Sequence, residues 1–267
     1  MVVGDAFSLW ISREVKFMLR EILRTRNIFA LKDRELNLEE EQRLCHWIAK
    51  RKEGYPLQYI FGHWDFYGLD FLVDERALIP RPETEELVDR LIGRIHDGQE
   101  VLEIGVGSGV ILLSLSVNQP KCHYVGTDIS KEALALTDDN AIHLKTNVEL
   151  IQSDVYDNLK NRKFHWIISN PPYIDDEGMN ELRKELSFEP ANALYGGPDG
   201  LLIYKRIIEE AYEHLYNQGN IAMEIGYNQK EAIFSLLETN GFENLECFQD
   251  YAGFDRMVFA KLREKRD

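Results

Sequence analysis

The stretch Glu103-Ile104-Gly105-Val106-Gly107-Ser108-Gly109 decides the fold that we expect for this chain. It lies between an apolar run at 100–104 and a second apolar run at 110–117, so the sequence predicts a strand, a glycine loop and a helix in succession. Glycines let the backbone turn sharply and approach a ligand closely, and the start of a helix exposes free N–H groups. The loop is therefore a candidate ligand-binding site at the end of a strand.

Strand-like and helix-like segments alternate after this loop. Further strands are expected at 123–127, 148–151, 166–169 and 220–225, and further helices at 130–145, 200–216 and 229–238. This alternation predicts an α/β fold with a doubly wound, mostly parallel sheet of the Rossmann-like type. Two final strands, near 244–248 and 256–261, have no clear helix between them, which predicts an antiparallel hairpin at one edge of a seven-stranded sheet.

A small helical unit is expected ahead of the α/β domain. Residues 11–26 have the spacing of an amphipathic helix, and Asn37 with Glu40 three residues later predicts a capping box that starts a second helix. Aromatic and β-branched residues in the segment 58–73 predict a β-hairpin. We therefore divide the chain into an N-terminal helical domain for substrate recognition (1–56), a hairpin linker (57–78) and the α/β domain (79–267).

The composition narrows the class of protein. With 44% hydrophobic and 29% charged residues, the chain should form a packed core. Its formal net charge is −15, whereas proteins that bind phosphate backbones usually carry a basic face, so we expect no direct nucleic-acid partner. The three cysteines form no CxxC pair and the seven histidines show no ligand spacing, so no metal site is expected. No signal peptide or membrane span is evident, and we expect a cytoplasmic monomer.

Two acidic residues indicate what the glycine loop binds. The loop spacing is GxGxG and not GxGxxG, and Glu103 would sit badly beside a pyrophosphate. A carboxylate there suits a ligand with an amino group, such as the methionine part of S-adenosylmethionine. Asp128 ends the next strand, where an acid commonly accepts hydrogen bonds from ribose hydroxyls. Because Ser130 is already a good cap for the following helix, a ligand role for Asp128 is favoured over a capping role.

The segment Ser153-Asp154-Val155 follows the third strand, where an adenine ring would lie. Asp154 is a candidate acceptor for the exocyclic amine, and Val155 is a candidate to pack on the ring. The candidate cofactor-binding residues are thus Glu103, Gly105, Val106, Gly107, Ser108, Gly109, Asp128, Ile129, Asp154, Val155 and Asn170.

The tetrapeptide Asn170-Pro171-Pro172-Tyr173 follows the fourth strand directly. In a sheet of order 3-2-1-4-5, the first and fourth strands are neighbours at the switch point, where ligands bind. The glycine loop and this tetrapeptide should therefore face each other. The Asn170 side-chain carbonyl and the Pro171 backbone carbonyl can both accept from a planar NH2 group, orient its nitrogen and stabilise growing positive charge. We expect Asn170 and Pro171 to be catalytic, and all four residues to bind the substrate.

With these motifs, the chain resembles the HemK-type release factor glutamine methyltransferases. The segments that carry the resemblance are Ile79-Pro80-Arg81-Pro82-Glu83-Thr84, the Glu103–Gly109 loop, Asn170-Pro171-Pro172-Tyr173, Phe188-Glu189-Pro190, Gly196-Gly197-Pro198-Asp199-Gly200, and Glu224-Ile225-Gly226 with Gln229. The resemblance implies methylation, by S-adenosylmethionine, of the N5 amide of glutamine in the Gly-Gly-Gln loop of peptide-chain release factors. Two departures are Val106, where a threonine is usual, and Val155, where some members have an aromatic residue.

Two other functions remain as alternatives. An N6-adenine methyltransferase also presents acceptors to a planar NH2 group, but it would have to capture a base, and the charge of −15 argues against nucleic acid. A catalytically silent module that docks on release factors is the second alternative. The intact Asn170 and the intact glycine loop argue against it. We expect the loop 174–200 and the N-terminal helices to grip the release factor.

Overall fold

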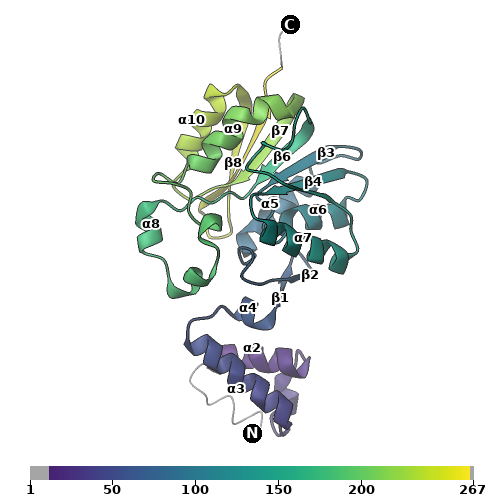
Figure 1. The fold of residues 1–267 in the computed structure, drawn as a ribbon, viewed down its shortest axis with the longest axis vertical. Coiled ribbons are helices and arrows are strands. Elements are labelled where there is room, and N and C mark those ends of the chain that lie inside the picture. The colour runs from purple at the N-terminus through teal and green to yellow at the C-terminus, as the bar shows by residue number, and fades with distance from the viewer. Residues whose placement is uncertain (1–11, 265–267) are drawn as a thin grey trace. The chain divides into compact units, whose positions relative to one another are not determined.

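The computed structural model describes residues 12–264, which form two compact units, one ending at Gly62 and the other beginning at His63 (Figure 1). The N-terminal unit contains α2 (Ser12–Leu23), a short 3-10 helix η1 (Ile28–Leu31), α3 (Leu38–Lys52) and α4 (Leu57–Phe61). Its core joins Val15, Met18 and Leu19 of α2 to Leu44 of α3. The predicted first helix is confirmed but ends at Leu23, and residue 11 of that prediction lies outside the described residues.

The capping box predicted at Asn37 is confirmed. The Asn37 side chain accepts from the Glu40 backbone N–H, and the Glu40 carboxylate accepts from the Asn37 backbone N–H, both at 2.9 Å. Glu40 also forms an ion pair with Arg34 at 2.9 Å. This reciprocal pair satisfies two of the N–H groups that the first turn of a helix leaves free, and therefore fixes where α3 begins.

The β-hairpin is shorter than the predicted segment 57–78. Strands β1 (His63–Phe66) and β2 (Leu69–Leu72) pair antiparallel, and Tyr67 and Gly68 turn between them with φ of 50° and 72°. Residues 57–61 form helix α4 instead of strand, because Pro56 lies at its N-cap and Gly62 ends it in the left-handed conformation. The aromatic residues there had suggested a strand, but these two flanking residues favour a single helical turn.

The second unit contains a seven-stranded sheet in the order β5-β4-β3-β6-β7-β9-β8. Strands β3 to β7 are parallel, and β9 is antiparallel to both of its neighbours. Their bounds are β3 Glu100–Ile104, β4 His123–Asp128, β5 Glu149–Gln152, β6 Phe164–Ser169, β7 Leu215–Glu224, β8 Phe242–Gln249 and β9 Asp255–Leu262. The predicted doubly wound sheet with an antiparallel hairpin at one edge is confirmed.

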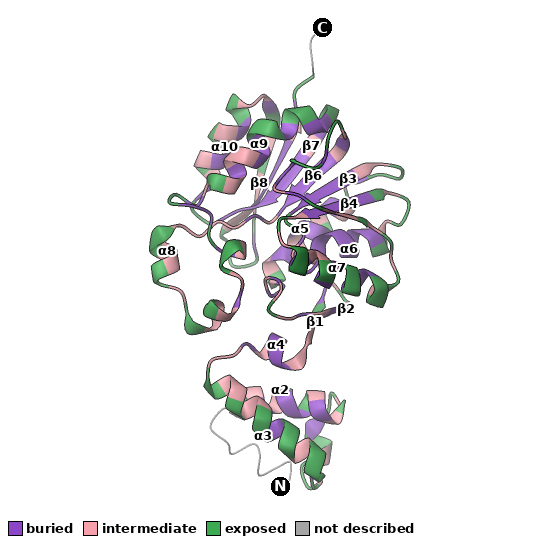
Figure 2. Cartoon of the chain, viewed as in Figure 1, coloured by how far each residue is buried: buried purple, intermediate pink, exposed green. Residues whose placement is uncertain are grey.

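Helices cover both faces of this sheet (Figure 1). One face carries α5 (Pro82–Ile92), α6 (Val110–Asn118) and α7 (Lys131–Leu144), and the other carries α9 (Leu202–His214) and α10 (Lys230–Thr239). The central strands β3 and β6 are almost wholly buried between the two layers (Figure 2), whereas the edge strands β5 and β8 are mostly half-buried or exposed. The segment from Asp176 to Ala193 contains only short helices: α8 (Asp176–Asn180), η2 (Lys184–Phe188) and η3 (Ala191–Ala193). None of the helices described between residues 12 and 264 has the length and apolar composition needed to cross a bilayer.

The two candidate motifs lie at the ends of neighbouring strands. In the parallel register of β3 and β6, Ile104 pairs with Ser169, and the Ser169 hydroxyl donates to the Ile104 carbonyl at 2.7 Å. The glycine loop therefore starts beside the tetrapeptide Asn170–Tyr173. This is the switch point of the sheet, where the order reverses between β3 and β6.

Candidate active site

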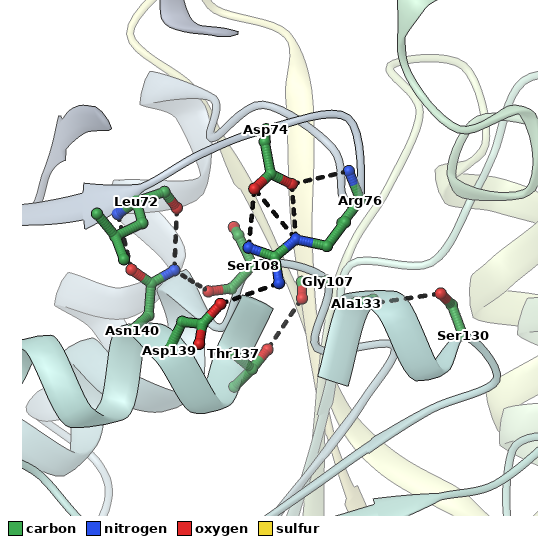
Figure 3. A network of polar contacts seen from close by, with 10 residues as sticks. All are labelled: Leu72, Asp74, Arg76, Gly107, Ser108, Ser130, Ala133, Thr137, Asp139 and Asn140. Atoms are coloured by element: carbon green, nitrogen blue, oxygen red, sulfur yellow. Dashed lines mark hydrogen bonds and ion pairs between the residues drawn. The ribbon is translucent and has the colours of Figure 1, made fainter. Parts of the chain in front are cut away.

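Helix α7 holds the glycine loop in place (Figure 3). The Thr137 hydroxyl donates to the Gly107 carbonyl and the Asn140 side chain donates to the Ser108 carbonyl, each at 2.9 Å. Asn140 is fully buried and also bonds both backbone groups of Leu72, at 2.7 and 3.0 Å. One buried amide thus connects the glycine loop to the end of the hairpin.

Gly109 lies at the N-cap of α6, where it allows close packing. Its φ is +82°, and a Cβ atom there would lie 2.7 Å from Thr137 Cγ2 and 2.9 Å from Leu113 Cδ1. Neither that backbone conformation nor that contact is open to a larger residue. The structure therefore gives the last glycine of the loop a packing role, whereas the residues before it line the cavity described below.

Glu103 is a buried acid beneath the loop, with 1% of its surface exposed. Its carboxylate accepts from the Leu112 backbone N–H at 2.7 Å, and no basic side chain among the described residues pairs with it. Burial raises the pKa of Glu103 well above its ordinary value, and the nearby Asp128 raises it further. A cationic group bound beside Glu103 would favour the charged form of this carboxyl group. The position is therefore suited to an ammonium ion.

Asp128, the predicted ribose-binding acid, also holds the glycine loop. Its two carboxylate oxygens accept from the backbone N–H groups of Gly107, at 3.0 Å, and Ser130, at 2.9 Å. The Ser130 hydroxyl accepts from Ala133 N at 3.1 Å and caps α7, as expected. Burial raises the pKa of Asp128. Because an ionised carboxylate offers about four acceptor positions, Asp128 can still accept from a ribose hydroxyl.

The segment after β5 contains a contact that the sequence did not indicate. Asp154 forms an ion pair with Arg206 of α9, with Oδ1 and Nη1 2.7 Å apart. Val155 is buried and has a φ of +50°, a rare conformation for a β-branched residue that is typical of functional sites. Arg206 lies 52 residues beyond Asp154, and only its position on an expected helix could have suggested a role.

A cavity of about 360 Å³ gathers most of the candidate cofactor-binding residues. The candidates in its wall are Glu103, Gly105, Val106, Gly107, Ser108, Asp128, Ile129, Asp154, Val155 and Asn170. Pro172 also lines it, as do residues 76–81, Thr84 and Arg206. Gly109, Pro171 and Tyr173 do not.

A second cavity of about 210 Å³ lies on the other side of Asn170. Asn170, Pro171 and Tyr173 line it, together with Arg81 and Glu224. Asn170 and Arg81 therefore belong to the walls of both cavities. Burial raises the pKa of Tyr173 to about 12, so its hydroxyl is neutral at physiological pH.

Two glycines pack directly on the backbone of the tetrapeptide. A Cβ atom at Gly196 would lie 2.5 Å from the Pro172 carbonyl oxygen, and one at Gly200 would lie 2.4 Å from the Tyr173 carbonyl oxygen. The Gln229 side chain donates to the Tyr173 and Gly200 carbonyls, both at 3.1 Å. The glycine segment 196–200 thus holds the tetrapeptide through main-chain contacts.

An ion pair fixes the segment that lines both cavities. Arg81 Nη2 lies 2.6 Å from Glu189 Oε1, and Glu189 Oε2 accepts from the Ile79 backbone N–H at 2.9 Å. Both residues belong to motifs that carry the family resemblance, but nothing in the sequence pairs them. Thr84 and Glu224 likewise belong to these motifs, and both are buried in the site.

The residues of the larger cavity fit S-adenosylmethionine. Glu103, a buried carboxylate without a basic partner in the described part of the chain, matches its ammonium group. Asp128 has free acceptor positions for the ribose, and the Asp154–Val155 segment offers an acceptor and an apolar surface for adenine. The carboxylates of Glu103 and Asp128 in the cavity wall suit a ligand that carries a sulfonium and an ammonium charge.

Comparison with known proteins agrees with this geometry. The family model described as "Methyltransferase small domain" matches residues 83–203. A methyltransferase from Pyrococcus furiosus shares the fold, with a TM-score of 0.59 and 19% identity over 84% of this chain and 98% of that chain. The fold and the cavity define a methyltransferase that uses S-adenosylmethionine.

The relatives in sequence are more specific. The release factor glutamine methyltransferase of Streptococcus pneumoniae is 40% identical over 90% of this chain and 87% of its own length. The release factor glutamine methyltransferase of Buchnera aphidicola is 34% identical over 94% of this chain and 92% of its own length. The family model described as "PrmC N-terminal domain" matches residues 12–62. The chain belongs to the release factor glutamine methyltransferase family.

Proposed function

We propose that this enzyme transfers a methyl group from S-adenosylmethionine to the N5 side-chain amide of the glutamine in the Gly-Gly-Gln motif of peptide-chain release factors. The observation that supports it most is the position of Asn170 in the walls of both cavities. The larger cavity fits the cofactor, and the smaller one, at about 210 Å³, has room for one flat side chain. A substrate amide in the smaller cavity would therefore meet the cofactor at Asn170.

Methyl transfer to an amide nitrogen depends more on hydrogen-bond acceptors for the NH2 group than on a general base. An amide nitrogen is a poor nucleophile because its lone pair is delocalised into the carbonyl group. S-adenosylmethionine supplies a methyl group activated by its sulfonium. The Asn170 side-chain carbonyl and the Pro171 backbone carbonyl accept from the substrate NH2 group, orient its lone pair and stabilise the positive charge that grows on it. Such preorganised contacts contribute about 3–4 kcal/mol, and alignment of the nitrogen contributes more. The extra proton leaves after transfer.

We infer that the protein substrate is recognised outside these cavities. Residues 12–56, the described part of the N-terminal domain, contribute no side chain to either cavity, so this domain is free to contact the release factor. The loop 174–200 lines the cavities in part, and its exposed residues offer a second surface for the same partner. Deleting residues 1–56 should raise the Michaelis constant for the release factor well above its value in the intact enzyme, and leave that for the cofactor nearly unchanged. Equal effects on both constants would contradict a role in substrate recognition.

We also propose that the enzyme is a monomer and that it acts in the cytoplasm, the compartment in which its substrate takes part in translation. Light scattering coupled to gel filtration measures the mass directly. A mass near 31.1 kDa supports the monomer, and twice that value contradicts it.

Transfer from labelled S-adenosylmethionine to a purified release factor tests the main proposal. The Gly-Gly-Gln→Gly-Gly-Ala variant of the factor and a DNA duplex serve as parallel substrates. Label in the wild-type factor alone supports glutamine methylation. Label in the DNA would instead support an N6-adenine methyltransferase, and cofactor binding without any label would support a silent docking module.

A further inference from the structure

A buried pair of side chains lies behind Asn170. The Thr84 hydroxyl, in the first turn of α5, donates to Glu224 Oε2 at the end of β7, at 2.6 Å. Each residue has only 2% of its surface exposed. The Asn170 side-chain nitrogen reaches the same Thr84 oxygen at 3.5 Å, a long contact of the kind that tightens when a substrate binds. The three residues form a chain from Glu224 through Thr84 to Asn170.

The direction of these bonds fixes the orientation of the Asn170 amide. An ionised carboxylate only accepts, and a threonine hydroxyl has a single proton. When Glu224 is ionised, that proton must go to Glu224, so the Thr84 oxygen can only accept from Asn170. The Asn170 NH2 group is therefore held towards Thr84, and its carbonyl oxygen is left for the substrate nitrogen.

The surroundings of Glu224 leave this chain as its main side-chain contact. The groups that act on it electrostatically are Arg256, Glu83 and Arg81, and Tyr173 and Tyr204 also face it. Arg256 directs its own hydrogen bonds elsewhere, to Asp250 Oδ2 at 3.1 Å and to the Ile225 carbonyl at 3.2 Å. The Tyr204 hydroxyl bonds the Glu224 backbone carbonyl. Among the described residues, Thr84 alone donates a hydrogen bond to the Glu224 carboxyl.

We propose that Glu224, acting through Thr84, is a positioning residue that determines which edge of the Asn170 amide faces the substrate, and that one proton on Glu224 reverses this orientation. The proposal rests on the proposed methyl transfer to an amide NH2 group. Glu224 and Thr84 touch neither the transferred methyl group nor the nitrogen that receives it.

The same donor and acceptor count permits the reversal, because it frees the Thr84 proton. A protonated Glu224 donates to the Thr84 oxygen, and the Thr84 proton is then free to donate to the Asn170 carbonyl. The amide turns over and presents its NH2 group to the substrate NH2 group, so the acceptor needed for transfer is lost. Burial raises the pKa of Glu224 to about 7, which makes both states accessible near neutral pH. Activity should rise as the pH rises through this value.

Two other buried acids titrate in the site and must be distinguished from Glu224. Burial raises the pKa of both Glu103 and Asp128, but both line the cofactor cavity and bond the glycine loop or α6. Their protonation should alter the Michaelis constant for S-adenosylmethionine. Protonation of Glu224 should lower the transfer rate at saturating cofactor.

Single-turnover transfer to a release factor, measured against pH at saturating cofactor, tests the proposal in the full chain. Thr84→Val keeps the side-chain shape but removes the hydroxyl, and should lower the transfer rate by about a hundredfold, as a misplaced group can, without the inflection near pH 7. Thr84→Ser restores the hydroxyl and should recover most of that loss together with the inflection. Glu224→Gln should also lose the inflection.

A readout that does not depend on activity follows the Asn170 amide itself. Its side-chain NH2 resonance, assigned by its absence in Asn170→Ala, should shift with a midpoint near pH 7 in the wild type and in Thr84→Ser, and not in Thr84→Val. A Thr84→Val enzyme that folds normally and keeps its rate, or an Asn170 resonance that does not respond to pH, would overturn the proposal. Absence of transfer by the wild type would instead contradict the proposed function, and the resonance would still test the chain of bonds.

Discussion

The guanidinium of Arg81 lies 2.6 Å from the carboxylate of Glu189, and 108 residues of chain separate the two. Glu189 is almost wholly buried, with 2% of its side chain exposed, and it also accepts from the Ile79 backbone N–H. This one carboxylate therefore anchors the segment that lines both cavities to the loop that follows the tetrapeptide.

Replacing Arg81 with alanine should lower the free energy of unfolding by about 3 kcal/mol, because it leaves a buried charge without its partner. The matched control is Arg162→Ala, which removes another Arg–Glu pair whose carboxylate, on Glu149, is 54% exposed. An exposed pair of this kind contributes about 0–1 kcal/mol. Urea denaturation measures both losses, and similar values for the two variants would contradict the buried role of Glu189.

Asn170→Ala should abolish methyl transfer while the affinity for S-adenosylmethionine stays within a few fold, because only the acceptor for the substrate nitrogen is lost. Loss of one preorganised electrostatic contact lowers kcat by about a hundredfold to a thousandfold. Asn240→Ala is the control, since Asn240 bonds the Leu236 carbonyl at the end of α10. Turnover retained in Asn170→Ala would rule out the proposed role of Asn170.

Asp128→Ala should weaken cofactor binding by about a hundredfold, because hydrogen bonds to a charged group are each worth about 1.5–3 kcal/mol. Part of the loss comes from the glycine loop, since Asp128 also holds Gly107 N. Asp128→Asn retains one acceptor oxygen and should lose less. Asp97→Ala removes an exposed acid paired with Lys121 and should leave the affinity for the cofactor unchanged. Calorimetry gives the three affinities, and an unchanged value for Asp128→Ala would limit Asp128 to a structural role.

Gly200→Ala should destabilise the protein and lower its transfer rate together. Gly200 has a φ of +69°, and the new Cβ would meet the Tyr173 carbonyl oxygen at 2.4 Å. Gly241→Ala is a matched control, because Gly241 has a φ of +84° but nothing within 4 Å of the same position. Both variants carry the backbone strain, which costs about 1–2 kcal/mol, and only Gly200→Ala displaces the tetrapeptide. Equal transfer rates in the two variants would show that this contact does not matter for catalysis.

Glu224→Gln should stabilise the protein at pH 8 and have little effect at pH 4. The folded protein keeps a proton on Glu224 up to a pKa of about 7, whereas the unfolded chain releases it near the ordinary value of 4.5. Folded stability therefore falls as the pH rises between these values. Glutamine cannot ionise and avoids this loss, which amounts to as much as about 3 kcal/mol at about 1.4 kcal/mol per pKa unit. Thermal unfolding of both proteins across this pH range measures the difference, and parallel curves would contradict it.

The sequence predicted those features that depend on neighbouring residues or on strand order. The capping box at Asn37, the cap at Ser130 and the sheet with its edge hairpin all follow from local patterns. The adjacency of the glycine loop and the tetrapeptide followed from topology alone, because β3 and β6 had to be neighbours at the switch point.

Features that depend on distant pairs could not be predicted. Thr84 and Glu224 lie 140 residues apart, and neither position has a pattern that points to the other. The same holds for Asp154 with Arg206. Aromatic residues favour strands, so the sequence predicts a strand where residues 57–61 form a helix. The proline before this segment and the glycine after it determine the local structure.

The way that Gly196 and Gly200 pack on the tetrapeptide has a consequence for how this enzyme can evolve. One of the two proposed acceptors is the main-chain carbonyl of Pro171, which every amino acid possesses, so no substitution at that position deletes it. The acceptor can be lost only if the chain around it moves. Mutations that tune or disable it should therefore arise at the two glycines, whose missing side chains leave the space that the Pro172 and Tyr173 backbone occupies.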